Sequence, residues 1–381
     1  MKQLLICVDW FEPAIRAGGP ITSCTNLVRM LAEHSEVAVL TGSRDLGADD
    51  DLPGVVSGRW NRWADIADVW YATRQQHRFW AFYRAYKAKK PNAVYLNSMF
   101  SVPGTILPML TSQLLRSTRF VLAPRGMLKP TALATRQGRK KLWIRFLKLS
   151  GIAKTIHFHA TSAEEADEIR VHFGINAAIT VIPNVPRVPT HHLDTLDKQP
   201  GQLRLSFVGR VHPIKNLHIL LDLIASLKGT CHLDIVGPVE DENYWARCEQ
   251  TIQSLSNNIQ VTLHGALAVD ESLAIVKKTH AMFLPTQGEN FGHAIFEAMG
   301  VGVPVLISDQ TYWRGLESHH AGWDIPLEDS PRFQQTLARL IAMDQTEHSH
   351  WRKGALENAN RFFRENNLKD AYMKLFFPEQ G

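Results

Sequence analysis

Cysteine is scarce in this sequence, and the few that occur show no metal-binding pattern. The 381 residues include four cysteines, Cys7, Cys24, Cys231 and Cys248. No two of them form a Cys-x-x-Cys pair, and four in a chain of this length are too few for a disulfide-stabilised scaffold. The composition therefore predicts a protein of a reducing compartment without a cysteine-based metal site.

A strong excess of charge of one sign is also missing. Lys and Arg number 42 and Asp and Glu 37, which leaves a formal net charge of +5. This excess favours anionic partners, but it is too small and too dispersed to indicate a nucleic-acid-binding protein. We therefore predict no nucleic-acid partner.

Long apolar runs are absent as well. No segment approaches the roughly 20 apolar residues that cross a bilayer. The apolar opening, residues 4–8, ends at Asp9 and is too short for the core of a signal peptide, so we interpret it as a buried strand. The protein is expected to be cytoplasmic, with peripheral contact at the inner face of the membrane as a further expectation.

Strand and helix patterns alternate along the whole chain. Short apolar runs, typical of parallel strands covered on both faces, lie at 4–8, 36–41, 93–96, 120–123, 155–160 and 181–183, and again at 203–208, 231–236, 259–263, 281–284 and 304–307. Helical patterns separate them, among them 21–33, 79–89, 138–149, 217–226, 242–255, 270–278 and 292–300. The alternation predicts an α/β fold built from βαβ units with parallel sheets.

The length predicts two domains, because a chain of 381 residues is about two and a half times as long as a typical single domain. Residues 185–201 contain three prolines and a glycine and show no periodicity, which indicates a linker at 187–201. We therefore predict a first domain over 1–186 and a second over 202–362. The helical stretch at 363–377 is predicted to pack back on the first domain, together with the rest of 363–381.

A first candidate site follows the predicted strand at 203–208. The chain continues Gly209-Arg210 and, five residues after Arg210, reaches Lys215. Loops at the carboxyl ends of parallel strands are where ligands bind in α/β sheets. An arginine that forks two oxygens and a lysine that adds a point charge suit a diphosphate. The alternative is a solvated loop with two surface cations.

A second candidate site opens the helix predicted at 292–300. Glu289 and Glu297 lie eight positions apart, about 12 Å if the whole span were helical, which exceeds the separation in a glycoside hydrolase. The spacing better suits two carboxylates that hold distant hydroxyls of one long ligand. Phe291 and Gly292 offer backbone N–H groups at a helix N-terminus. The alternative is an ordinary pair of helix-surface charges.

A third candidate is the Gly18-Gly19-Pro20 turn between the first strand and the first helix. Glycine allows a phosphate to approach the backbone closely. A plain turn explains the same residues.

Taken together, these motifs resemble the retaining glycosyltransferases of family four. The resemblance rests on Gly209-Arg210 with Lys215-Asn216, on the string GENFGHAIFEAMGVGVPV that contains Glu289 and Glu297, and on RAGGP, APRGML, HATSAEEADEI and VIPNV in the order the family shows. It implies a GT-B fold, in which two Rossmann-like domains face each other across a cleft and a C-terminal helix crosses back.

The resemblance also implies residue roles. Arg210 and Lys215 would hold the donor diphosphate, Glu297 the nucleotide ribose, and Glu289 a hydroxyl of the donor sugar. The backbone at Asn290, Phe291 and Gly292 would help to seat that sugar, and Gly19 would approach the diphosphate from the other domain. Arg210, Lys215 and Glu289 are the predicted catalytic residues.

No metal and no separate cofactor are expected, because the two cations would stabilise the leaving diphosphate and the nucleotide-sugar is itself a substrate. Anomeric configuration would be retained, with a donor phosphate oxygen taking the acceptor's proton. Some relatives place a histidine where this chain has Pro124-Arg125-Gly126, so we predict Arg125 as a substitute contact to donor or acceptor. His293 is a further candidate contact, although a packed histidine explains it too.

A basic stretch of the sequence is compatible with an acceptor located at a membrane surface. Residues 136–148 carry Arg136, Arg139, Lys140, Lys141, Arg145 and Lys148 with apolar residues between them. On a helix this pattern can dock on anionic lipid, and a solvated face over a normal core stripe explains it equally well. Docking would favour an acceptor carried on a lipid diphosphate. The predicted function is transfer of a hexose to a glycan or lipid-linked glycan acceptor in the synthesis of lipopolysaccharide, exopolysaccharide or another cell-surface polysaccharide.

Two other functions compete with hexosyl transfer. A sugar-nucleotide epimerase can use the same architecture, but it needs acid and base residues at a sugar carbon and the sequence offers no clear set. A noncatalytic donor-binding scaffold subunit is the other, and the presence of all four polar donor contacts argues against it. The sequence leaves open the nucleotide base, the donor sugar, the acceptor, the linkage and the oligomeric state.

Overall fold

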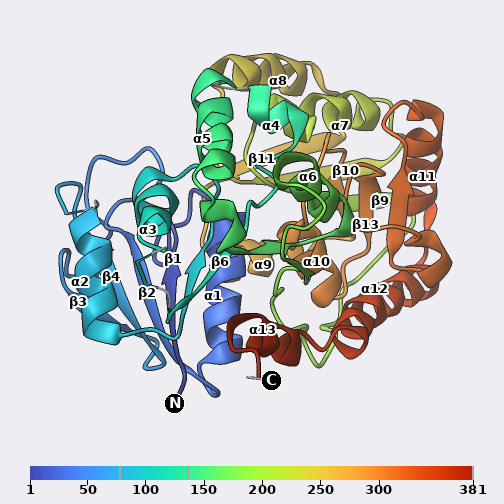
Figure 1. The fold of residues 1–381 in the computed structure, drawn as a ribbon. Coiled ribbons are helices and arrows are strands. Elements are labelled where there is room, and N and C mark those ends of the chain that lie inside the picture. Colours follow the sequence, from blue (N-terminus) through green and yellow to red (C-terminus); the bar gives the residue numbers. More distant parts are fainter. Residues whose placement is uncertain (77–78, 113, 116, 135–136, 380–381) are drawn as a thin grey trace. The chain divides into compact units, whose positions relative to one another are not determined.

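The computed structural model describes residues 1–76, 79–112, 114–115, 117–134 and 137–379. By its internal contacts the chain divides into two compact units (Figure 1). Unit 1 comprises Met1–Val185 and Asn367–Gly381, and unit 2 comprises Pro186–Asn366. The predicted linker at 187–201 thus belongs to unit 2, where Lys198 is buried and its Nζ donates to three backbone carbonyls.

Unit 1 is built on an eight-stranded sheet in the order β3-β4-β2-β1-β5-β6-β7-β8. All neighbouring strands run parallel except β3, which pairs antiparallel with β4. The strands are β1 (Gln3–Cys7), β2 (Glu36–Gly42), β3 (Trp60–Trp63), β4 (Ala67–Ala72), β5 (Ala93–Leu96), β6 (Arg119–Leu122), β7 (His157–Ala160) and β8 (Ile179–Val181).

The helices of unit 1 connect these strands and cover the sheet (Figure 1). They are α1 (Gly19–Leu31), α2 (Phe79–Lys89), α3 (Leu107–Leu110), α4 (Pro130–Ala134), α5 (Gln137–Leu149), α6 (Ala163–Phe173) and α13 (Leu368–Phe376). Side chains from the central strands pack with those of α2, α3, α4, α5 and α6 in one buried apolar cluster. The C-terminal helix α13 is part of this unit and contacts α1, β5 and β6.

Unit 2 repeats the plan with a six-stranded, all-parallel sheet in the order β11-β10-β9-β12-β13-β14. Its strands are β9 (Gln202–Val208), β10 (Thr230–Val236), β11 (Ile259–Gly265), β12 (Ala281–Leu284), β13 (Val305–Ser308) and β14 (Gly322–Ile325). Its helices are α7 (Leu217–Ile224), α8 (Glu242–Ser254), α9 (Val269–Val276), α10 (His293–Gly300), α11 (Ser330–Ala342) and α12 (Gln345–Glu365).

Local sequence explains where several of these helices begin. Ser162, Asp241, Asp329, Asp344 and Asn367 each place a side-chain oxygen against a backbone N–H of the first turn. Such N-caps satisfy donors that have no partner inside the helix. The helices therefore begin at defined residues.

The structure confirms the α/β fold with two parallel sheets. The β3–β4 hairpin and the edge strand β14 are not among the strands predicted from the sequence, and the helix predicted at 363–377 is divided between two helices. The structure ends α12 at Glu365 and begins α13 at Leu368, because Asn367 caps the second helix. Among the described residues, no helix is both long and apolar enough to cross a membrane.

Candidate functional site

In unit 2 the predicted donor residues gather where the strand order reverses. The chain forms β9 first, adds β10 and β11 on one side of it, and then returns to add β12 and β13 on the other. The loops after β9 and β12 therefore meet at the carboxyl edge of the sheet, which is where ligands bind in open α/β folds. One loop carries Arg210 and Lys215, and the other carries Glu289.

These two loops are fixed to each other by hydrogen bonds. The backbone N–H of Gln287 donates to the carbonyl of Ile214 at 2.8 Å, and the Asn216 side chain donates to the carbonyl of Pro285 at 2.8 Å. Asn216 adopts a left-handed conformation with φ 53°, which ends the short helical turn Pro213–Lys215 before α7 begins. The positions of Lys215 and Glu289 are thus set by backbone contacts as well as by their own side chains.

Lys215 and Glu289 form a direct ion pair. The ammonium of Lys215 contacts Oε1 of Glu289, and the two side chains are only 14% and 17% exposed. The stem of Lys215 lies beside Gly209, at ordinary van der Waals distance from the place a Cβ would occupy. A cation and a carboxylate that share one partly desolvated position can bind a phosphate oxygen and a sugar hydroxyl side by side.

Arg210 points to a different partner. Its guanidinium pairs with Glu240, which follows β10, and both side chains are partly exposed. The turns after β9 and β10 pack tightly: a Cβ on Gly237 would lie 2.0 Å from the carbonyl oxygen of Gly209. Gly237 has φ 145°, so both the conformation and the close approach require glycine here. Glu240 lies outside every motif recognised in the sequence, so it was not among the predicted site residues.

Glu297 lies on α10 with a buried carboxyl group. Its Oε1 atom is out of contact with solvent and has no hydrogen-bond partner among the described residues. Burial raises the pKa of Glu297 to about 7, the nearby Arg187 opposes this rise, and Asp270 adds to it. Arg187 and Asp270 form an ion pair of their own at 2.6 Å. A buried carboxyl oxygen without a partner is costly, and hydroxyl donors from a ligand would satisfy it.

The start of α10 is held by aromatic packing. Phe291 is buried, and its carbonyl accepts a hydrogen bond from the indole of Trp313 at 2.6 Å. Gly292 caps the helix with φ 74°, where a Cβ would lie 2.9 Å from the Ile295 side chain. His293 is buried with its ring 4.9 Å from that of Phe291, while Asn290 is exposed. The helix N-terminus is therefore rigid, as a backbone anion or hydroxyl site needs to be.

In unit 1 the structure places Arg125 at the end of a directed hydrogen-bond chain. Arg125 follows β6 with φ 58° and donates to the hydroxyl of Tyr95 at 2.7 Å. Burial lowers the pKa of His159 to about 3, so its ring is neutral. Its Nε2–H donates to the carbonyl of Ile182 at 2.8 Å, and therefore Nδ1 accepts the Tyr95 hydroxyl at 2.7 Å.

Two asparagines complete this arrangement. The side-chain oxygens of Asn97, after β5, and Asn184, after β8, both accept hydrogen bonds from the Arg125 guanidinium. Asn97 also donates to the buried Cys24 thiol on α1. Arg125 is consequently fixed in direction at the carboxyl edge of the first sheet. Gly19 is exposed at the N-terminus of α1, which follows β1 at the same edge.

The predicted site residues thus form separate groups. Lys215 and Glu289 are in contact, whereas Arg210, on the same loop as Lys215, pairs with Glu240. Glu297 lies on the helix that follows the Glu289 loop, with Arg187 nearby. Gly19 and Arg125 belong to unit 1. Among the described residues, no group of three or more His, Cys, Asp and Glu side chains lies close enough together to hold a metal ion.

Two family models each match one half of this chain. Residues 17–185 match the model described as "Glycosyltransferase Family 4", and residues 192–357 match that described as "Glycosyl transferases group 1". An O-antigen chain mannosyltransferase, RfbU, from Salmonella typhimurium is 25% identical over 53% of this chain and 55% of its own length. The chain thus spans about half the length of the curated relatives it matches.

Solved structures show the same fold at low identity. Sucrose-phosphate synthase from Thermosynechococcus elongatus superposes with a TM-score of 0.72 at 17% identity, over 99% of this chain and 98% of that one. The Anabaena protein HepE, in complex with UDP-glucose, gives 0.70 at 15% identity, over 98% and 99%. The lipopolysaccharide glycosyltransferase WaaG gives 0.64 at 15% identity, over 98% and 99%. These matches confirm the predicted GT-B fold class.

Proposed function

Because this chain belongs to the family-four glycosyltransferases of the GT-B superfamily, we propose that it transfers a hexose from a nucleotide-diphosphate-sugar to a glycan or lipid-linked glycan acceptor. The observation that carries this proposal is the Lys215–Glu289 pair at the switch point of the second sheet. It combines the cation that a diphosphate needs with the carboxylate that a sugar hydroxyl needs.

The donor is proposed to bind along the loops of unit 2. Lys215 and Arg210 hold the diphosphate oxygens, Glu289 accepts a hydroxyl of the sugar, and the carboxyl group of Glu297 accepts the ribose hydroxyls. Support comes from the partly desolvated pair, from the unpartnered oxygen of Glu297 and from the structural neighbour HepE, which was crystallised with UDP-glucose. Asn290, Phe291, Gly292 and His293 border this region at the start of α10.

The proposed reaction retains anomeric configuration. The bond from the anomeric carbon to the leaving phosphate oxygen breaks, and the bond to the acceptor oxygen forms on the same face of the sugar. The acceptor's proton passes to a phosphate oxygen of the departing nucleoside diphosphate. The two cations stabilise the charge that develops on the diphosphate, so no metal is required in this proposal.

A ligand panel tests the donor half of the proposal. UDP, GDP, ADP and their sugars are added to the protein, and the unfolding temperature is recorded with and without EDTA. A ligand that binds the folded protein raises the free energy of unfolding by about 2.7 kcal/mol when its concentration is one hundred times its Kd. NMR of the product then gives the anomeric configuration. An altered free donor with no acceptor requirement would instead identify an epimerase.

The acceptor side of the proposal places the protein at an anionic membrane through α5. Leu142, Phe146 and Leu149 are 70%, 42% and 78% exposed, and their spacing puts them on one face of the helix. Arg139, Lys141, Arg145 and Lys148 are exposed beside them. Exposed apolar residues with flanking cations fit a lipid headgroup layer. Arg136 lies outside the described residues.

Charge reversal on α5 tests membrane contact. Lys140 is unsuitable, because its ammonium donates to the carbonyl of Ala132 at 2.6 Å within the unit. We therefore expect the double variant Lys141→Glu and Arg145→Glu to lower co-sedimentation with phosphatidylglycerol vesicles. The matched control is Lys278→Glu with Lys353→Glu, two exposed lysines of unit 2. Equal binding by both double variants and the native protein would reject membrane contact.

A further inference from the structure

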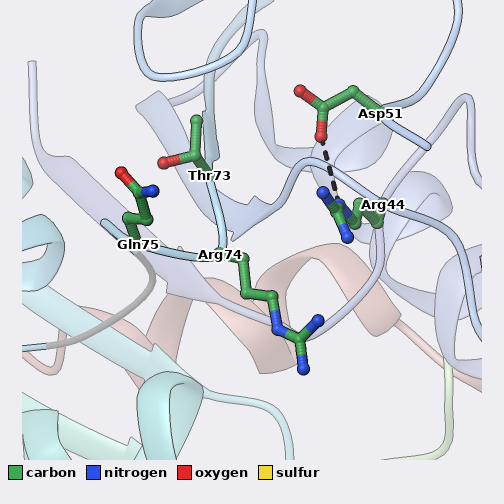
Figure 2. Close-up of a pocket in the computed structure, with 5 residues that line it drawn as sticks. All are labelled: Arg44, Asp51, Thr73, Arg74 and Gln75. Atoms are coloured by element: carbon green, nitrogen blue, oxygen red, sulfur yellow. Dashed lines mark hydrogen bonds and ion pairs between the residues drawn. The ribbon is translucent and has the colours of Figure 1, made fainter. Parts of the chain in front are cut away.

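A polar pocket lies in unit 1, apart from the residues assigned above. It has a volume of about 550 Å³ and is lined by Arg44, Asp51, Thr73, Arg74 and Gln75 (Figure 2). Its size falls within the range of small-molecule sites. No residue of this pocket belongs to the motifs that indicated glycosyl transfer.

Strand register brings the two arginines of this pocket together. Strands β2 and β4 are parallel neighbours, with Gly42 opposite Ala72 at their carboxyl ends. Arg44 and Arg74 each follow two residues later, and the N–H of Ser43 still donates to the carbonyl of Ala72 at 2.9 Å. The two cations therefore leave the same edge of the sheet at the same level, where ligands of α/β proteins bind.

One wall of the pocket is rigid and ionised. The Asp51 carboxylate accepts hydrogen bonds from the hydroxyls of Ser43 and Ser57, both at 2.7 Å, and the Arg44 Nε approaches it at 3.5 Å. The Ser43 hydrogen bond is the main cause that lowers the pKa of Asp51. Asp51 is thus a fixed anion that holds Arg44 in place.

The opposite wall carries the exposed side chain of Arg74. Among the described residues, none forms a hydrogen bond or ion pair with the Arg74 guanidinium, and Figure 2 shows this side chain extending away from Thr73 and Gln75. Two guanidinium groups and one carboxylate leave the lining with one net positive charge. The Thr73 hydroxyl and the Gln75 amide add groups that both donate and accept. The complement is a ligand with one negative charge and several hydroxyls.

The position of the pocket shows which part of a substrate it would meet. The β2–β4 pair and the β5–β6 pair, from which Asn97 and Arg125 extend, are three strand spacings apart in the sheet order, about 14 Å at roughly 4.8 Å each. A ligand group bound in the pocket would therefore lie well away from Arg125, along the same edge of the sheet. An extended ligand that contacts Arg125 would reach the pocket with one of its distal units.

From this arrangement we propose that the pocket is a second acceptor subsite, which binds a hydroxylated acceptor unit carrying a single negative charge. The unit is a uronic acid or a sugar joined through a phosphodiester. Arg74 and Arg44 pair with the anion, and Thr73, Gln75 and Asp51 meet the hydroxyls. This inference rests on the proposed glycosyl transfer and adds the chemical class of the acceptor.

Binding of small probes tests the subsite directly. Methyl glucuronide, methyl glucoside and glycerophosphoglycerol are titrated into the full-length protein, and the arginine Nε–H signals are followed by NMR. We expect the anionic probes to shift the signals of Arg44 and Arg74, and the neutral glucoside to bind at least tenfold more weakly. A preference between the two anionic probes identifies the source of the charge. No shift of either signal with either anion would overturn the proposal.

Variants separate this subsite from the transfer reaction. Arg74→Gln is expected to weaken the anionic probe about tenfold, whereas Arg170→Gln, an exposed arginine of α6, leaves it unchanged. In both variants the binding of the preferred nucleotide and the slow transfer of sugar to water stay at the native level. Native-like probe binding by Arg74→Gln would refute the subsite alone. Absence of any nucleotide binding in the native protein would refute the proposed function instead.

Discussion

Replacing Glu297 by glutamine should change how the stability of the protein depends on pH. Burial raises the pKa of this carboxyl group from an ordinary 4.5 to about 7 in the folded chain. Between pH 4.5 and pH 7, Glu297 is therefore protonated in the folded state and ionised in the unfolded chain. Stability from this group is fully present below pH 4.5 and is lost as pH rises through 7. The difference between the two pKa values corresponds to a change on the order of 3 kcal/mol in the free energy of unfolding.

Urea unfolding at pH 5 and pH 8 measures this effect. In the native protein the raised pKa of Glu297 lowers the free energy of unfolding at pH 8 relative to pH 5. In Glu297→Gln the side chain is neutral at both values, so the drop should shrink by up to about 3 kcal/mol. The control is Glu249→Gln, an exposed carboxylate of α8, which should keep the native slope. Equal pH slopes in the native protein and in Glu297→Gln would refute the reasoning.

The same carboxyl group should report on nucleotide binding. Ribose hydroxyls that donate to Glu297 favour its ionised form, so binding lowers its pKa and releases a proton. With a free pKa of about 7, roughly half a proton leaves at pH 7. The number of protons released is measured by calorimetry of nucleotide binding in two buffers of different ionisation enthalpy. A nucleotide that binds with the same proton release in Glu297→Gln would show that the ribose lies elsewhere.

Three further substitutions test the site and its framework. Lys215→Met removes the cation that faces Glu289 and should weaken nucleoside-diphosphate binding at least tenfold in calorimetry, and unchanged affinity would remove Lys215 from the site. Gly237→Ala should cost about 3 kcal/mol, seen as a lower Tm, because its Cβ would lie 2.0 Å from the carbonyl oxygen of Gly209; a native Tm would contradict the close approach. Asp241→Ala should cost about 1 kcal/mol because Asp241 caps α8, whereas Asp241→Asn should stay near native.

The buried strands were predictable from sequence because parallel strands are apolar throughout. The runs at 93–96 and 281–284 coincide with β5 and β12, and all residues of both strands are buried. The β3–β4 hairpin was not predicted because the residues of its edge strand are not continuously buried and apolar. Strand β3 has no fully buried residue, and its Trp60 and Trp63 are only partly covered. Edge strands of this kind lack the continuous apolar signal.

The candidate site was predictable only in part, for a similar reason. Arg210, Lys215, Glu289 and Glu297 lie in strand-end loops or on the helix that follows, and chain position alone identifies such loops. The pairing of the cations was not predictable, because Glu240 and Glu289 come from different crossovers. Nor does any local pattern place Arg187 near Glu297, since 110 positions separate them along the chain. Contacts of this kind depend on the strand order of the finished sheet.

The Lys215–Glu289 pair is better understood as a ligand site than as a source of stability. Taking both charges partly out of water costs free energy that their attraction only partly returns. The two loops are also joined by neutral hydrogen bonds of Asn216 and Gln287, so the ion pair is not their sole connection. In the proposed function, this pair lies at the switch point of the sheet and keeps its charges available for the donor substrate. Loss of Glu289 should therefore change ligand binding far more than folding.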